Sequence, residues 1–141
     1  MADAQHDWFI GLWELDPTQS DYQMGMPPQT SLYRIAPDAN GSGYMISMSW
    51  TDAQGRESYA AYTAMPDGVH YPYENSDVAD AISMTRLDER TLDSAIYKDG
   101  VCIAYSVRLL SDDGQLMQIT QSGYAQDGST FENKSLYVRK S

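Results

Sequence analysis

Short runs of β-branched, aromatic and methionine residues alternate along the chain with clusters of glycine, aspartate, asparagine and proline. The runs recur at intervals of about ten residues, a spacing typical of an antiparallel sandwich or barrel, and helical periodicity is nearly absent. This pattern restricts the chain to an all-β fold. We expect nine strands, at residues 9–16, 30–36, 43–51, 57–65, 81–88, 91–98, 101–110, 115–124 and 130–140.

The segments between these strands indicate how they are connected. DANGSG, DAQG, DERT, KDG, SDDG and AQDG are rich in residues that tolerate positive φ, so consecutive strands are predicted to be hairpin partners. Closing such a sheet removes the exposed edges that an open sheet has to protect. The predicted fold is therefore a single antiparallel up-and-down β-barrel of about 8 to 10 strands that spans residues 1–141.

Length and charge narrow the classes of function. A chain of 141 residues, 42% of them hydrophobic, fits one globular domain. The acidic protein has a formal net charge of −11, from 20 acidic and 9 basic residues spread over the whole length. This charge repels phosphate backbones and anionic membrane surfaces, so we expect no nucleic-acid and no membrane partner. The sequence leaves monomer and homodimer open.

The single cysteine and the N-terminal sequence give expectations about disulfides and localisation. Cys102 is the only cysteine, which excludes an internal disulfide framework and a zinc site built on several thiolates. The start, MADAQHDWFIGLWELD, lacks the basic and apolar regions of a signal peptide, so we expect a cytoplasmic protein. A chain whose signal had been trimmed would look the same and would be exported.

One segment interrupts the series of hairpins. Residues 16–29, DPTQSDYQMGMPPQ, contain three prolines, and proline cannot donate to a central ladder. We therefore expect a long connection here, which is either a lid over one end of the barrel or a plain surface loop.

A family resemblance covers nearly the whole chain. Gly11-Leu12-Trp13 resembles the Gly-x-Trp signature of the lipocalins and the wider calycin barrels, in which the tryptophan closes one end and a basic residue of the last strand packs over it; Arg139 stands at that place. The combined pattern of GLWELDPTQSDY, PPQTSLYRIAPD, YTAMPDGVHYPYENSDVADAISMTRLDERT and LLSDDGQLMQITQSGYAQDG is similar to a group of small bacterial lipocalin-like proteins. The resemblance implies the barrel fold more than any activity, and it carries over no catalytic residues.

Alternation along each strand predicts which side chains face the interior, because the more apolar face of a strand should point into a barrel with a wet exterior. Strand 101–110 is ambiguous, since Val101, Ile103, Tyr105 and Val107 oppose Cys102, Ala104, Ser106 and Arg108. The expected interior positions of the other strands are Tyr33, Ile35, Tyr44, Ile46, Met48, Trp50, Ile82, Met84, Leu92, Ile96, Met117 and Ile119. As ligand-binding candidates we take Tyr33, Tyr44, Met48, Trp50, Tyr62, Met84, Arg86 and Tyr105.

Arg86 shares a face with Ile82 and Met84, which places a guanidinium near or inside the barrel. A buried cation needs a partner. That partner is an internal acid or tyrosine, or the carboxylate or phenolate of a bound ligand, unless Arg86 forms a salt bridge at the rim.

The segment DGVHYPYE, residues 67–74, holds the internal histidine, His70, next to Tyr71 and Tyr73. His70 titrates near neutrality if unperturbed, so these three residues are the catalytic candidates for general acid/base chemistry. A solvated rim loop is the competing interpretation. A nucleophilic triad and a metal site are both disfavoured, because His6 and His70 are the only histidines and no ligand spacing or Gly-x-Ser-x-Gly motif occurs.

Three hypotheses of function follow. The first is binding of a small apolar or aromatic ligand in the barrel, with an anionic group on the ligand as an option near Arg86. The second is a cofactor-free isomerase, cyclase or lyase that acts on a small apolar substrate in the same cavity, with no cofactor or metal expected. The third is a purely structural or interaction role, which an exposed apolar patch without a cavity would favour.

Overall fold

The computed structural model describes residues 7–23, 25–39, 41–73, 79–124 and 127–141. These residues form strands and turns and no helix, so none of their segments is a helix long and apolar enough to cross a membrane. The ten strands are β1 (Gly11–Tyr22), β2 (Thr30–Pro37), β3 (Tyr44–Thr51), β4 (Glu57–Ala64), β5 (Tyr71–Pro72), β6 (Ala81–Asp88), β7 (Thr91–Lys98), β8 (Val101–Leu110), β9 (Leu116–Tyr124) and β10 (Thr130–Arg139).

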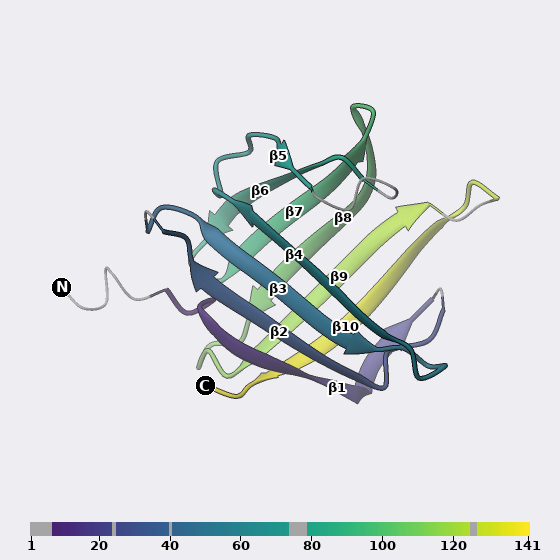
Figure 1. Ribbon diagram of the computed structural model, residues 1–141. Helices are drawn as coiled ribbons and strands as arrows, with labels where there is room; N and C mark the ends of the chain where they lie inside the picture. Colours follow the sequence, from purple (N-terminus) through teal and green to yellow (C-terminus); the bar gives the residue numbers. More distant parts are fainter. Residues whose placement is uncertain (1–6, 24, 40, 74–78, 125–126) are drawn as a thin grey trace.

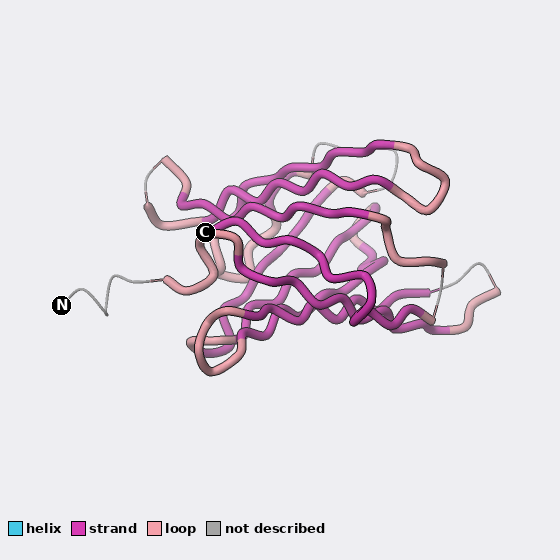
Figure 2. The backbone as a smooth tube through the Cα atoms, turned by 90° about the horizontal axis from the view of Figure 1, so that it is seen from below, coloured by secondary structure: helices cyan, strands magenta, loops and turns pink. Residues whose placement is uncertain are grey.

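All ten strands belong to one antiparallel sheet in the order β4-β3-β2-β1-β10-β9-β8-β7-β6-β5. Every neighbouring pair except β1 and β10 is consecutive in the chain, which is up-and-down topology (Figure 1). The sheet curls into two facing layers (Figure 2), so that β4 at one end lies against β5 and β6 at the other. No ladder joins these ends, and the barrel is nearly closed, with a seam between β4 and β5. The predicted all-β barrel is confirmed.

The nine expected strands are present, and two differences concern prolines. β1 continues to Tyr22, whereas we expected the connection to begin at residue 16. The ladder between β1 and β10 is interrupted between Asp16 and Asp21, so the missing N–H of Pro17 falls in an irregular stretch. β5 is an additional short strand, and Pro72 is tolerated there because β5 lies at the edge of the sheet.

One end of the barrel is closed by the residues that carry the family resemblance. Trp13 is fully buried and its indole N–H donates to the carbonyl of Phe9 at 3.1 Å. The guanidinium of Arg139 lies 4.3 Å from the centre of the Trp13 ring and donates to the carbonyl oxygens of Ile10 and Gly114. A Cβ at Gly11 would lie 2.5 Å from Nη1 of Arg139, so only glycine permits this packing.

The hydrophobic core lies toward this closed end. Apolar side chains from both layers meet there, and the largest fully buried ones are Trp13, Phe9, Ile35, Ile46, Ile82, Met84, Leu92, Leu110 and Met117. At the opposite end, called the mouth below, the inward-facing positions of the same strands carry serine, tyrosine and glutamine. The core therefore fills one half of the barrel, and the other half is hollow.

β8 contains a bulge that determines which of its residues face the interior of the barrel. Tyr97 of β7 pairs with Cys102 and Ile96 pairs with Ala104, so Ile103 has no partner in the ladder. Beyond the bulge Ser106, Arg108 and Leu110 face the interior; Ser106 and Arg108 line the cavity, and Arg108 and Leu110 are buried.

Candidate functional site: a polar cavity in the barrel

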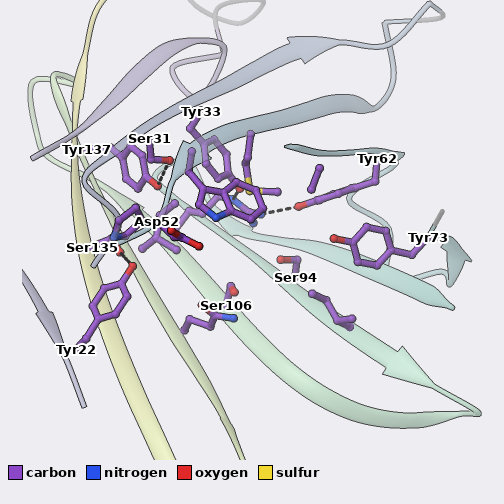
Figure 3. A pocket seen from close by; sticks show the side chains of 18 of the residues that line it. Tyr22, Ser31, Tyr33, Asp52, Tyr62, Tyr73, Ser94, Ser106, Ser135 and Tyr137 are labelled. Atoms are coloured by element: carbon purple, nitrogen blue, oxygen red, sulfur yellow. Dashed lines mark hydrogen bonds between the residues drawn. The ribbon is translucent and has the colours of Figure 1, made fainter. Parts of the chain in front are cut away.

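A cavity of about 410 Å³ occupies the mouth half of the barrel (Figure 3). Its size lies within the range of small-molecule sites, about 300–1,000 Å³. Residues of eight strands and of the connections around the mouth line it: Tyr22, Met26, Pro28, Ser31, Tyr33, Met48, Trp50, Asp52, Ala60, Tyr62, Tyr73, Ser94, Ile96, Ser106, Arg108, Ile119, Gln121, Ser135 and Tyr137.

Arg108 is the central polar group of the cavity. Its side chain is 2% exposed, in a position where β8 faces the interior. Nε donates to the hydroxyl oxygen of Tyr33 at 2.8 Å, and Nη2 donates to the hydroxyl oxygen of Tyr62 at 2.8 Å. Nη1 is buried and has no hydrogen-bond partner among the described residues.

The charge of Arg108 is not balanced by a neighbouring acid. An arginine side chain stays protonated in proteins, so this cation is buried with hydroxyl oxygens as its partners and forms no ion pair within the described chain. Tyr33 does not supply a negative charge, because burial raises the pKa of its hydroxyl far above the ordinary value. A buried cation with an unsatisfied donor atom is energetically costly, and an anion next to Arg108 would lower this cost.

Four further hydroxyl groups in the cavity wall form two pairs. The hydroxyls of Ser31 and Tyr137 lie 3.0 Å apart, and those of Tyr22 and Ser135 lie 2.8 Å apart. Burial raises the pKa of Tyr137 to about 12, so its hydroxyl is neutral at physiological pH. Each pair uses one of its two O–H hydrogens, which leaves one donor and several lone pairs for a ligand.

The connection between β1 and β2 borders the mouth. Met26 and Pro28 of this connection line the cavity together with Trp50 at the end of β3. Asp52 follows Trp50, but its carboxylate is held by Arg56 in an ion pair of 2.8 Å and by backbone N–H groups of the turn. The described part of the proline-rich segment therefore borders the mouth, with Met26 71% exposed.

The predicted ligand-binding residues separate into three places. Tyr33, Met48, Trp50 and Tyr62 lie in the cavity wall, as expected. Tyr44 and Met84 face the interior but are buried at the closed end, outside the cavity, because alternation gives the face of a residue and not its depth along the barrel.

Tyr105 lies on the outer surface, where its side chain is 38% exposed and its hydroxyl donates to Asp93 at 2.7 Å. The expectation that Tyr105 lines the cavity is therefore wrong. The bulge of β8 and the small interior residues of that strand explain the error, since the apolar face of β8 is its outer face.

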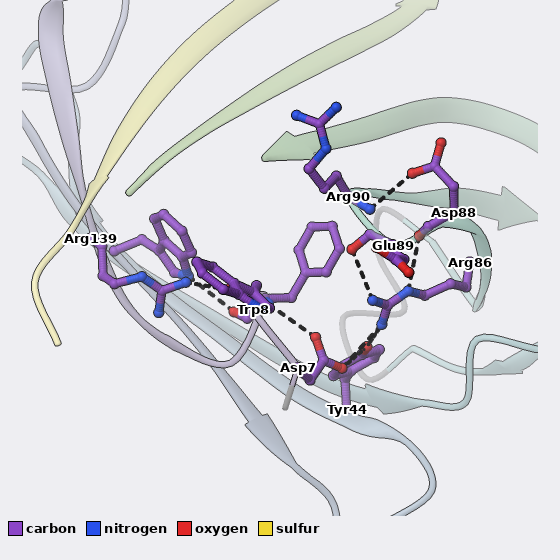
Figure 4. Close-up of polar contacts among 10 residues, drawn as sticks. Asp7, Trp8, Tyr44, Arg86, Asp88, Glu89, Arg90 and Arg139 are labelled. Carbon is purple, nitrogen blue, oxygen red and sulfur yellow. Dashed lines mark hydrogen bonds and ion pairs between the residues drawn. The ribbon is translucent and has the colours of Figure 1, made fainter. Parts of the chain in front are cut away.

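Arg86 also lies outside the cavity, at the closed end (Figure 4). Nη1 donates to Asp7 at 3.1 Å and to the hydroxyl of Tyr44 at 2.7 Å, and Nε and Nη2 donate to the carbonyl oxygens of Asp88 and Glu89. A part-exposed acid and a tyrosine are therefore its partners, and this ion pair at the end of the barrel corresponds to the rim salt bridge that the sequence left open. Each nitrogen of this guanidinium already donates at least one hydrogen bond, and its side chain does not line the cavity.

The residues of DGVHYPYE face in different directions. The ring of His70 is exposed and stacks on Tyr97 at 4.0 Å, on the outer face of β7. The hydroxyl of Tyr71 is held by Asp67 at 2.8 Å. Tyr73 reaches the cavity and meets Tyr62 edge to face at 5.7 Å across the seam. The three catalytic candidates therefore do not form one site; Glu74 and the following residues to 78 lie outside the described residues.

Arg108 was not among the ligand-binding residues predicted from the sequence, and it is the only cation among the residues that line the cavity. In the run VCIAYSVRLL, Arg108 alternates on one face with Ala104 and Ser106, but most arginines on strands are exposed to solvent, so its position alone gave no signal. Its inward neighbours Ala104 and Ser106 are small, so the apolar face of the strand is misleading. No cluster of three histidine, cysteine or acidic side chains with metal-binding proximity occurs within the described residues.

Comparison with solved structures finds the same architecture elsewhere. Zebrafish ileal bile acid-binding protein, solved in complex with cholic acid, superposes with a TM-score of 0.57 over 94% of this chain and 98% of its own, at 11% identity. The chain has a lipocalin-like calycin fold. The siderocalin Ex-FABP, described as having dual ligand specificities, covers 94% of this chain and 74% of its own at 14% identity, with a TM-score of 0.44. No family model and no curated protein matches the sequence.

Proposed function

We propose that the protein binds a small apolar or aromatic molecule with an anionic group, which enters the cavity and pairs with Arg108. The unsatisfied Nη1 of Arg108 carries this proposal, because a donor on a buried cation is most favourably satisfied by a carboxylate or a similar anion. The fold supports it further, since the superposed bile acid-binding protein holds a small molecule in its complex.

The ligand enters with its anionic end first. Along β8, Arg108 lies between Ser106 on the side of the mouth and Leu110 in the core of the closed end. Met48, Trp50, Ile96 and Ile119 offer apolar contact to the rest of the molecule. The negative charge of the ligand then replaces the missing counter-ion of the guanidinium in a place that excludes water.

The enzyme hypothesis has less support from the geometry. His70 lies on the outer surface, and the hydroxyl of Tyr71 donates a hydrogen bond to Asp67. Of the three candidates, Tyr73 alone lines the cavity. Burial raises the pKa of Tyr73, which makes its hydroxyl a weak proton donor at neutral pH. We therefore take binding, and not turnover, as the proposed function.

A matched pair of probes tests the proposal. Isothermal titration calorimetry with naphthylacetate and naphthylethanol compares an anion with a neutral molecule of similar shape. The wild-type protein should bind the acid at least about tenfold more tightly, because a charge-assisted hydrogen bond to a buried group contributes about 1.5–3 kcal/mol. Arg108→Met should abolish this preference, and Arg86→Met, the matched control at the closed end, should retain it. Equal affinity of wild type and Arg108→Met for the acid refutes the proposal.

A further inference from the structure

A row of polar side chains crosses the cavity wall on three neighbouring strands. Ser94 of β7 pairs in register with Ser106 of β8, and Ser106 pairs with Gln121 of β9. All three line the cavity. Adjacent strands lie about 4.8 Å apart, so the row extends over about 10 Å across the barrel wall.

The hydroxyl groups of this row are available to a ligand. Ser94 is 3% exposed, and within the described part of the chain neither its hydroxyl nor that of Ser106 has a hydrogen-bond partner. On the next strand, Ser135 adds a hydroxyl that is shared with Tyr22 and keeps spare bonding capacity. These hydroxyls open onto the cavity, so a ligand that displaces water from this wall binds best when it supplies donors and acceptors in place of that water.

The facing wall differs, because its polar groups already have partners: the hydroxyls of Ser31, Tyr33 and Tyr62 bond to Tyr137 or Arg108, and the carboxylate of Asp52 pairs with Arg56. Its other lining residues are mostly apolar. Met48 and Trp50 of β3 and Ala60 of β4 line it, and Met26 and Pro28 of the β1–β2 connection continue it at the mouth. None of these side chains can form a strong hydrogen bond except through the indole N–H of Trp50. The wall with the serines also contains two apolar residues, Ile96 and Ile119.

The distance between Arg108 and the polar row is set by their spacing along β8. Ser106 and Arg108 are two residues apart on the same face of β8, with Ser106 nearer the mouth. Two residues of a strand span about 7 Å. When the anionic group of a ligand contacts Arg108, the part of the ligand about 7 Å from that group therefore lies next to the row of hydroxyls.

We propose that the ligand is a broad, ring-based carboxylate that carries hydroxyl or carbonyl groups along one face and is apolar on the other. This inference rests on the proposed function and narrows its ligand class. The width of the polar row favours a fused-ring body, because a single alkyl chain contacts one or two strands and leaves the other hydroxyls unpaired.

Cholate and cholanate test the proposal as chemical probes, below their aggregation concentrations. They share a ring system and a carboxylate, but cholate alone carries hydroxyl groups on one face. Calorimetry should show that cholate binds at least about tenfold more tightly than cholanate, as expected for one or two additional buried hydrogen bonds. In Ser94→Ala combined with Ser106→Ala this ratio should fall to about one, while Ser49→Ala, on the outward face of β3, should leave it unchanged.

Two failures are distinguishable. If both carboxylates bind wild type equally, or if the double serine variant keeps the preference for cholate, the inference about the polar face is wrong and the anion site stands. If neither carboxylate binds and naphthylacetate shows no dependence on Arg108, the proposed function fails as well.

Discussion

Arg108, Tyr33 and Tyr62 form a buried polar cluster whose removal should stabilise the empty protein. The perturbation replaces all three groups by apolar ones of similar volume, in the combined variant Arg108→Met, Tyr33→Phe and Tyr62→Phe. The cluster contains two hydrogen bonds of 2.8 Å, one charge without an acidic partner and one unsatisfied donor. A cluster that serves folding would be fully paired, whereas this one leaves Nη1 of Arg108 unpaired, as the proposed anion site requires.

The expected magnitude follows from these contacts. Replacing a buried ionic cluster by well-packed apolar side chains is commonly neutral or stabilising by about 1–4 kcal/mol. For a chain of this length 1 kcal/mol corresponds to about 4 °C, so Tm should rise by about 4–16 °C. Arg108→Met alone should gain less, because the buried hydroxyls of Tyr33 and Tyr62 then lose their hydrogen-bond donors.

Calorimetric melting with and without naphthylacetate measures both consequences. A ligand at a hundred times its Kd stabilises the wild type by about 2.7 kcal/mol, and the triple variant should show no such gain. Arg86→Met is the control, since it breaks a part-exposed ion pair with Asp7 and should lower stability by about 1 kcal/mol while ligand stabilisation persists. A triple variant that melts below the wild type and still responds to the acid would refute the reasoning.

Three further predictions concern the closed end, the tyrosines and the outer surface. Trp13→Ala should lower the free energy of unfolding by about 3–5 kcal/mol in urea titrations, because Trp13 is fully buried under Arg139; a loss below 1 kcal/mol would contradict the packing. Burial raises the pKa of Tyr137 to about 12, so the stability it contributes is complete below about pH 10 and is lost as the pH rises toward 12; unfolding midpoints from pH 8 to 12 should fall less steeply in Tyr137→Phe than in wild type, and identical slopes would count against this. His70→Ala should leave the affinity for naphthylacetate within about twofold, since the ring stacks on Tyr97 outside the cavity; a tenfold loss would return His70 to the site.

Much of the fold follows from local rules that act within a strand and its turns. Turn residues such as those of KDG and SDDG lie between strands that pair as hairpins, and Trp13 and Arg139 meet as the resemblance implies. Pro17 was misleading, because a proline excludes a regular ladder but not an irregular one.

The candidate site was harder to predict, because three properties of it are not local. The bulge at Ile103 exchanges the faces of β8, which moves Tyr105 outward and Arg108 inward. Depth along the barrel separates Tyr44 from Met48 although both share one face of β3. The partner of each arginine comes from distant strands, so which of Arg86 and Arg108 retains an unsatisfied donor depends on tertiary packing.

A crystal structure of the complex with naphthylacetate tests the central claim most directly, because it locates the anionic group. We predict a carboxylate oxygen at about 2.7–2.9 Å from Nη1 of Arg108, with the aromatic ring in the cavity toward Trp50. A carboxylate bound at Arg86 or on the outer surface of the barrel, with the cavity filled by water, would contradict the account.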